Sequence, residues 1–191
     1  MTPDIPARRL ALAGILAAGP GLLLLVLANL ATARTGLIEA VADGVTAYIP
    51  VDVFSSGLET FGPLAKGLLH LGVAAGIAVA AALLATPAVR ATASTGWVRA
   101  GAWIGLLGIL VAEALVLPVF GGGFFGADLQ TDPVALHGPL VAASLLYGLL
   151  LARLRDGLRV RSRPLAPFIV DPRAERPTGM TRRSLLGRTI A

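Results

Sequence analysis

The sequence contains no cysteine, a single lysine and only two histidines among its 191 residues. The lack of cysteine excludes disulfides, thiolate metal sites, covalently attached haem and cysteine nucleophiles. Charged residues are also scarce, at 14%, whereas a soluble domain carries about 25%. Hydrophobic residues make up 55% of the chain, and the mean hydropathy is +0.79. This composition indicates a membrane protein.

Four apolar stretches approach or exceed the roughly 20 residues that cross about 30 Å of hydrocarbon. They cover residues 10–30, 64–85, 97–117 and 134–151. The first stretch is too long for the hydrophobic region of a signal peptide, so we expect it to stay as an anchored helix. The predicted fold is an all-α membrane protein with a four-transmembrane-helix bundle over residues 1–151.

The basic residues are unevenly placed along the chain. Fourteen of the sixteen lie at the N-terminus, between the second and third stretches or at the start of the third, or after Leu151; the exceptions are Arg34 and Lys66. Loops rich in Lys and Arg stay in the cytoplasm. We therefore expect a protein of the cytoplasmic (inner) membrane with both ends of this chain inside. Nucleic acid is not an expected partner, because the basic tail has no interleaved aromatic residues and no folded domain that presents it.

The first outer loop contains a segment with helical periodicity. From Leu37 to Tyr48, apolar residues recur at the spacing of one helix face, at Leu37, Ile38, Val41 and Val45. This pattern predicts an amphipathic helix on the outer membrane interface, with Tyr48 and Phe54 anchored at the depth of the lipid headgroups.

Glycine is concentrated at sites of close packing and sharp turns. Gly72 with Gly76, and Gly101 with Gly105, have the small-xxx-small spacing that brings helices together, and we favour packing within one bundle over a dimer interface. In the second outer loop, the three glycines 121–123 predict positive φ angles or a close approach by another segment.

Four ionisable residues lie in the outer half of the predicted spans: Lys66, His70, Glu113 and His137. We favour a polar network in which Glu113 pairs with Lys66 or with a histidine. A second hypothesis is that His70 and His137, from different helices, are the axial ligands of a b-type haem. A quinone or proton site is a third. No catalytic residues are predicted, because no nucleophile triad, phosphate loop or paired carboxylates occur at suitable spacing. No His-Glu-His metal site is predicted, because Glu113 is the one carboxylate available and the loop aspartates are distant.

Residues 152–191 form an Arg- and Pro-rich segment. Ten of the fifteen arginines lie between Arg153 and Arg188, so the sequence predicts a flexible cytoplasmic linker attracted to anionic headgroups. The final stretch "TRRSLLGR" has the order of a basic flank followed by the start of a further span. We expect either that the natural gene product continues into a fifth span and an exported domain, or that this chain is a fragment whose last residues lie loosely at the inner membrane surface.

The chain resembles the N-terminal membrane region of bacterial membrane-anchored, sulfite-oxidase-like molybdopterin-dependent oxidoreductases. The resemblance is carried by "YIPVDVFSSGLETFGPLAKGLL" (Tyr48 to Leu69), "LPVFGGGFFGADL" (Leu117 to Leu129) and "MTRRSLLG" (Met180 to Gly187). In that family the spans precede an Arg-rich linker, a further span and an extracytoplasmic domain that holds the molybdenum cofactor. In that family the molybdenum is bound partly by a cysteine thiolate in the downstream domain. The 191 residues of this chain include neither that domain nor any cysteine.

The resemblance implies an anchor or docking module for a molybdopterin redox domain, with no cofactor held by the chain itself and with the bilayer as its other partner. The alternative is a small electron-transfer protein that uses haem b or quinone at the outer His/Glu cluster. A carrier or channel ranks lowest, because no span carries polar residues through the whole depth of the bilayer. Whether the chain takes part in an enzyme depends on such a domain or subunit.

Overall fold

The computed structural model describes residues 5–32, 36–129 and 132–161. These residues form helices joined by short turns, with no strand among them. Four helices are long and apolar enough to cross a membrane, which confirms the predicted all-α four-span fold. They are α1 (Ala7–Thr32), α4 (Leu64–Ala91), α5 (Trp97–Val111) with its continuation through η1 (Ala112–Val116) and α6 (Leu117–Val119), and α7 (Pro133–Arg161).

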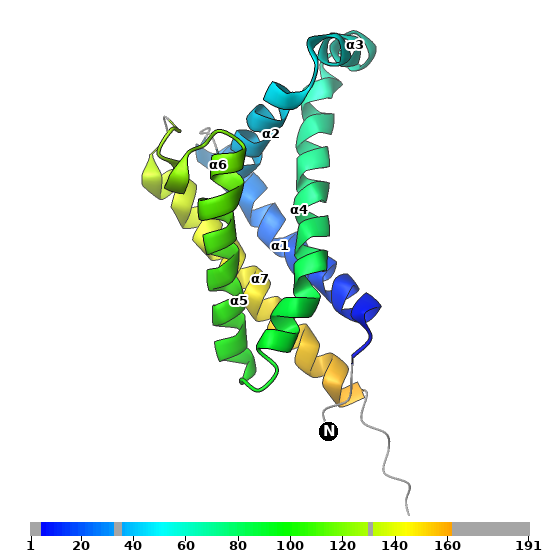
Figure 1. Cartoon of the computed structure of the whole chain (residues 1–191), viewed down its shortest axis with the longest axis vertical. Coiled ribbons are helices and arrows are strands. Elements are labelled where there is room, and N and C mark those ends of the chain that lie inside the picture. The colour runs from blue at the N-terminus through cyan, green and yellow to red at the C-terminus, as the bar shows by residue number, and fades with distance from the viewer. Residues whose placement is uncertain (1–4, 33–35, 130–131, 162–191) are drawn as a thin grey trace, which may run out of the picture.

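The spans alternate in direction between two ends of the molecule (Figure 1). The start of α1, the turn 92–96 and the end of α7 lie at one end, which we call the turn end. The other end, which we call the cap end, carries α2 (Leu37–Tyr48), α3 (Val51–Phe61) and the loop 120–129 with the short 3-10 helix η2 (Phe124–Gly126). The two ends of the bundle's chain therefore lie on the same side, as the alternation of four spans requires.

Helix α7 packs along both α5 and α1, and α1 also packs on α4. Glycines allow the closest of these contacts. A Cβ atom added at Gly101 would lie 2.8 Å from the Cα of Leu149, and one at Gly105 would lie 2.9 Å from the Cα of Leu145. Gly101 and Gly105 thus pack α5 against α7 within the bundle. Nothing lies within 4 Å of a Cβ atom built at Gly72 or Gly76, so this second pair makes no such contact.

Helix α2 has the bounds that its periodicity predicted. Its apolar face is buried rather than spread on a surface: Leu37 and Val41 belong to a core cluster with Leu117 and Leu136. A Cβ atom at Gly44 would overlap the carbonyl oxygen of Phe120. Helix α2 therefore closes the cap end of the bundle, with its apolar face packed against the core.

Helix α3 was not predicted. It begins after Pro50, has Asp52 in its first turn, and ends at Gly62, whose φ of 52° lies in the left-handed region that glycine tolerates. None of its residues is buried. In Figure 1 it projects beyond the start of α4 at the cap end.

Two helices extend beyond the apolar runs that predicted them. Helix α4 ends at Ala91 instead of residue 85, and α7 ends at Arg161 instead of residue 151. Residues 152–161 are therefore helical and do not belong to a linker. The length of an apolar run indicates only the part of a helix that lies in hydrocarbon, and the backbone hydrogen bonds of the helix can continue beyond that part. The remainder of the predicted linker, including Met180 to Gly187, lies outside the described residues, as does Arg34.

The glycine-rich loop adopts the predicted left-handed conformations in part. Gly121 and Gly123 have φ angles of 80° and 69°, and Gly126 has a φ of 71°. Phe125 shares this region with a φ of 55°, which is uncommon for a residue with a side chain. These angles fold the loop back over the cap end, where it packs on η1.

Candidate polar sites and cavities

Glu113 and His137 form a buried pair at the cap end. His137 Nδ1 lies 2.6 Å from Glu113 Oε1, and the Glu113 side chain is only 3% exposed. Glu113 lies in the π-helical segment η1, whose i→i+5 hydrogen bonding widens one turn, a feature common at functional sites. The other carboxylate oxygen, Oε2, is buried and accepts no hydrogen bond within the described part of the chain. The pair thus retains one unused acceptor in an apolar setting.

Lys66 does not join this pair. Its Nζ lies 3.2 Å from Glu39 Oε1 on α2, and the lysine side chain is 72% exposed. The contact ties the start of α4 to α2, although an ion pair this exposed contributes little stability. The predicted polar network is therefore divided: Glu113 pairs with a histidine, and Lys66 pairs with Glu39 of α2, which was not predicted as its partner.

His70 bonds within its own helix. Its Nδ1 donates to the carbonyl oxygen of Lys66, 2.7 Å away and one turn earlier. In both histidines, Nδ1 is engaged and Nε2 is left for another partner, which is the arrangement of a histidine oriented by a second group.

The structure does not bring the two histidines to one site. His70 lies near the start of α4 and His137 near the start of α7, and these two helix starts lie at opposite edges of the cap end in Figure 1, with α2 and α6 between them. Helices α4 and α7 make few contacts along their length. Within residues 5–32, 36–129 and 132–161, no group of three or more His, Asp or Glu side chains could hold a metal ion.

A groove lies between α2, α3 and α4 at the cap end, and we call it the cap groove. Its volume is about 460 Å³. The walls include Phe54, Leu58 and Phe61 of α3, and polar groups from Asp43, Lys66 and His70 lie among the lining residues. Tyr48 supports this region by donating its hydroxyl to the carbonyl oxygen of Val119, at 2.8 Å.

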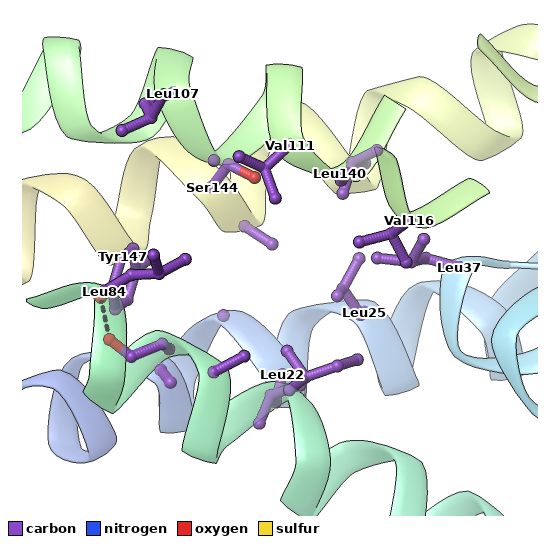
Figure 2. A pocket seen from close by; sticks show the side chains of 18 of the residues that line it. Leu22, Leu25, Leu37, Leu84, Leu107, Val111, Val116, Leu140, Ser144 and Tyr147 are labelled. Carbon is purple, nitrogen blue, oxygen red and sulfur yellow. Dashed lines mark hydrogen bonds between the residues drawn. The ribbon is translucent and has the colours of Figure 1, made fainter. Parts of the chain in front are cut away.

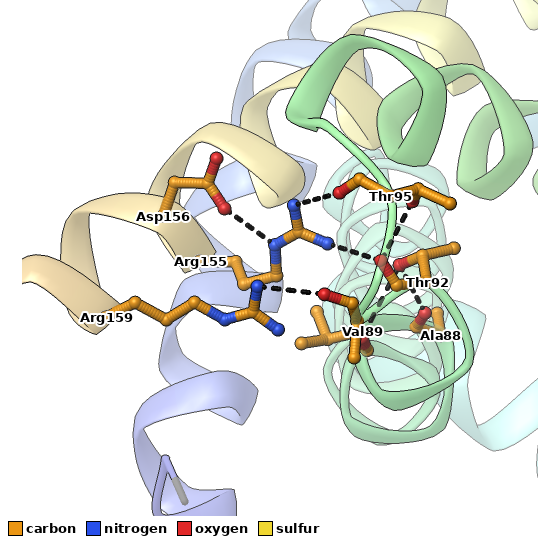
Figure 3. Close-up of polar contacts among 8 residues, drawn as sticks. Ala88, Val89, Thr92, Thr95, Arg155, Asp156 and Arg159 are labelled. Atoms are coloured by element: carbon orange, nitrogen blue, oxygen red, sulfur yellow. Dashed lines mark hydrogen bonds and ion pairs between the residues drawn. The ribbon is translucent and has the colours of Figure 1, made fainter. Parts of the chain in front are cut away.

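Arg155 is the most buried charged side chain at the turn end, with 1% exposure. Its guanidinium donates to the carbonyl oxygens of Thr92 (2.9 Å) and Thr95 (3.2 Å), and its Nε donates to Asp156 (2.9 Å), as Figure 3 shows. These carbonyls follow the end of α4, where a cation is also favoured by the helix dipole. The sequence predicted that this arginine belongs to a flexible linker attracted to anionic headgroups; its burial results from contacts with the turn 92–96, 60 or more residues earlier in the chain.

The chain matches no protein-family model, no curated protein and no solved structure. No relative therefore indicates the roles of the residues described above.

Proposed function

We propose that the chain is a membrane anchor and docking module for an extracytoplasmic, sulfite-oxidase-like molybdopterin-dependent redox domain. In this proposal the cap end faces the outside of the cytoplasmic membrane, and the turn end faces the cytoplasm. The partition of basic residues supports that orientation, since Arg90, Arg99 and Arg153 lie near the turn end.

The observation that carries the proposal is the exposure of α3. Five large apolar side chains of this helix are 42% to 80% exposed: Val51, Val53, Phe54, Leu58 and Phe61. They lie beyond the start of a span, beside a groove with a charged rim. An apolar centre with a polar rim is the usual form of a protein interface.

Two of the segments that carry the family resemblance lie at the cap end as well. Tyr48 to Leu69 includes α3 and the start of α4, while Leu117 to Leu129 includes α6 and the glycine-rich loop. The hydrogen bond from Tyr48 to Val119 joins the two segments directly. Residues far apart in the sequence thus contribute to one surface, as a docking site requires.

Photo-crosslinking tests the proposal. A photoreactive phenylalanine derivative at Leu58, introduced in cells that make their own molybdoenzymes, is expected to capture a molybdopterin-dependent protein that mass spectrometry identifies. The same residue at Leu83, which is exposed on the span α4, should capture lipid only. Lipid adducts alone at both positions would contradict docking.

A charged substitution provides an independent measurement. Leu58→Glu should lower the molybdenum content of washed membranes, because a carboxylate at the centre of an interface loses its hydration without gaining a partner. Thr60→Glu adds the same charge on the same exposed helix, outside the residues that line the groove, and should leave the molybdenum content unchanged.

The Glu113 and His137 pair favours a second candidate, an electron-transfer protein that binds a quinone at this site. Oε2 of Glu113 and Nε2 of His137 supply a hydrogen-bond acceptor and a second polar group in an apolar setting, as a quinol headgroup would need. Binding of a long-chain quinol to the purified protein, lost in Glu113→Leu and kept in His70→Ala, would promote this function over docking.

A further inference from the structure

A second cavity lies between the spans themselves. Helices α4 and α5 diverge from the turn 92–96, so that each packs on a different neighbour, α4 on α1 and α5 on α7 (Figure 1). The space that they leave has a volume of about 200 Å³, and we call it the lateral cavity. Figure 2 shows it surrounded by Leu107 and Val111 of α5, Leu84 of α4, and Leu22 and Leu25 of α1.

The lateral cavity opens toward the hydrocarbon of the membrane. Leu84 and Leu107 line it and are 47% and 51% exposed, while deeper lining residues such as Ala18 and Leu140 are buried. Leu107 follows the start of α5 by ten residues, or about 15 Å of helix, which is half of a hydrocarbon core of about 30 Å. The mouth is therefore continuous with the lipid-facing surfaces of α4 and α5.

The walls offer almost nothing to a polar ligand. Ser144 and Tyr147 supply the only hydroxyl groups among the lining side chains, and the Tyr147 hydroxyl already donates to the carbonyl oxygen of Ala81, at 2.8 Å. A bound water needs two to four polar partners, so apolar cavities of this kind stay dry. A charged headgroup would lose its hydration without compensation.

We propose that the lateral cavity binds one acyl chain of a membrane phospholipid, inserted between Leu84 and Leu107. An unfilled apolar space forfeits dispersion contacts, and acyl chains are the abundant apolar molecules at this depth. One turn of a helix from a second copy, about 10 to 12 Å across with its side chains and about 5.4 Å long, has a larger volume than the cavity's 200 Å³. The proposal does not rest on docking, because the cap groove lies on a different set of residues.

Native mass spectrometry of the full chain tests this binding. Protein extracted with a mild detergent from nanodiscs of palmitoyl-oleoyl phosphatidylglycerol is expected to retain one phospholipid. Ala80→Phe places a ring among the lining residues and should lower the retained fraction at least tenfold. Ala75→Phe makes the same change on an exposed part of α4 outside the cavity and should retain the lipid.

A second variant, which fills the interior of the lateral cavity, tests the proposal without a change at the mouth of the cavity. A Cβ atom at Gly108 would meet the Ser144 side chain at 3.6 Å, an ordinary contact, so Gly108→Leu should fold and exclude the lipid. Gly72→Leu, on an open face of α4, is its control. Equal retention in the wild type, Ala80→Phe and Gly108→Leu would overturn the proposal. Replacement of the phospholipid by an added polyprenyl quinone would overturn the assignment to an acyl chain.

Discussion

At the scale of single residues, glycine stabilises the contacts between helices here, as large apolar side chains do in the core of a soluble protein. Lipid tails are as apolar as leucine, so helices in a membrane associate through close van der Waals packing rather than by leaving water. Gly101, Gly105 and Gly148 bring α5 and α7 together at their backbones, and Gly148 approaches the carbonyl oxygen of Gly101 directly. The contact has no room for a side chain.

We expect Gly105→Leu to destabilise the bundle by about 1–3 kcal/mol or more, because the new side chain must displace the backbone of α7. Thermal unfolding in detergent measures the change. Gly72→Leu adds the same atoms where nothing lies within 4 Å and should unfold like the wild type. Equal losses in both variants would mean that α5 and α7 do not meet at Gly105.

Arg155 gives a second prediction at this scale. Arg155→Ala leaves the carbonyl oxygens of Thr92 and Thr95 without their donor and should cost about 3 kcal/mol. Arg155→Lys should recover only part of this loss, since an ammonium cannot reproduce the fork of a guanidinium.

Arg159→Ala is the matched control for that experiment. Arg159 of α7 donates to the carbonyl oxygen of Ala93 in the same turn 92–96, and this hydrogen bond is exposed. Removal of the Arg159 side chain should therefore change the stability by less than about 1 kcal/mol. The measurement is again unfolding in detergent. A larger effect at Arg159 than at Arg155 would contradict the importance of burial.

At the scale of elements, the cap depends on how α2 meets the loop after α6. Gly44→Val should push α2 away from Phe120 and expose the backbone of α2 to solvent. Hydrogen exchange is expected to accelerate in peptides from residues 37–48. Gly57→Val on α3 introduces the same side chain where nothing lies within 4 Å, and exchange in α2 should then remain slow.

The elements also divide into those that the sequence could predict and those that it could not. Helix α2 was predicted with its bounds, because its periodicity expresses one buried face. Helix α3 has an equivalent spacing at Val51, Phe54, Leu58 and Phe61, yet no helix was predicted there. Its start after Pro50 and its end at Gly62 were the missed indications.

Partners across the fold were harder to predict than helices. Glu113 was expected to pair with Lys66 or a histidine, and it contacts His137 from a π-helical turn, which no periodicity reveals. The contacts of Lys66 with Glu39 and of Arg155 with the turn 92–96 join residues far apart in the chain. Such contacts follow from the packing of whole helices, which a single sequence does not specify.

At the scale of the whole molecule, the orientation in the membrane can be measured directly. The chain has no native cysteine, so single substitutions give labelling without background. Ser56→Cys in α3 should react with an impermeant maleimide in intact cells, and Ser94→Cys in the turn 92–96 should react only after permeabilisation. The opposite pattern would reverse the proposed topology.

The purified protein is expected to carry no haem, because the starts of α4 and α7 lie at opposite edges of the cap end. A spectrum of the reduced minus the oxidised protein should lack a Soret band. A band that disappears in both His70→Ala and His137→Ala would refute this expectation and would favour the electron-transfer function.

The π-helical segment η1 changes the phase of the third span. Before it, Gly101 and Gly105 face α7; directly after it, Leu117 is fully buried while Val119 is exposed. Because one residue corresponds to about 100° of helix rotation, removing Ala114 would return the segment to a uniform α-helix and turn everything beyond it by that angle. Leu117 would leave the core, and the glycine-rich loop would begin on the wrong side of α2. A single residue in this turn thus sets the position of the cap, the smallest change in length by which a membrane helix can redirect the end that follows it.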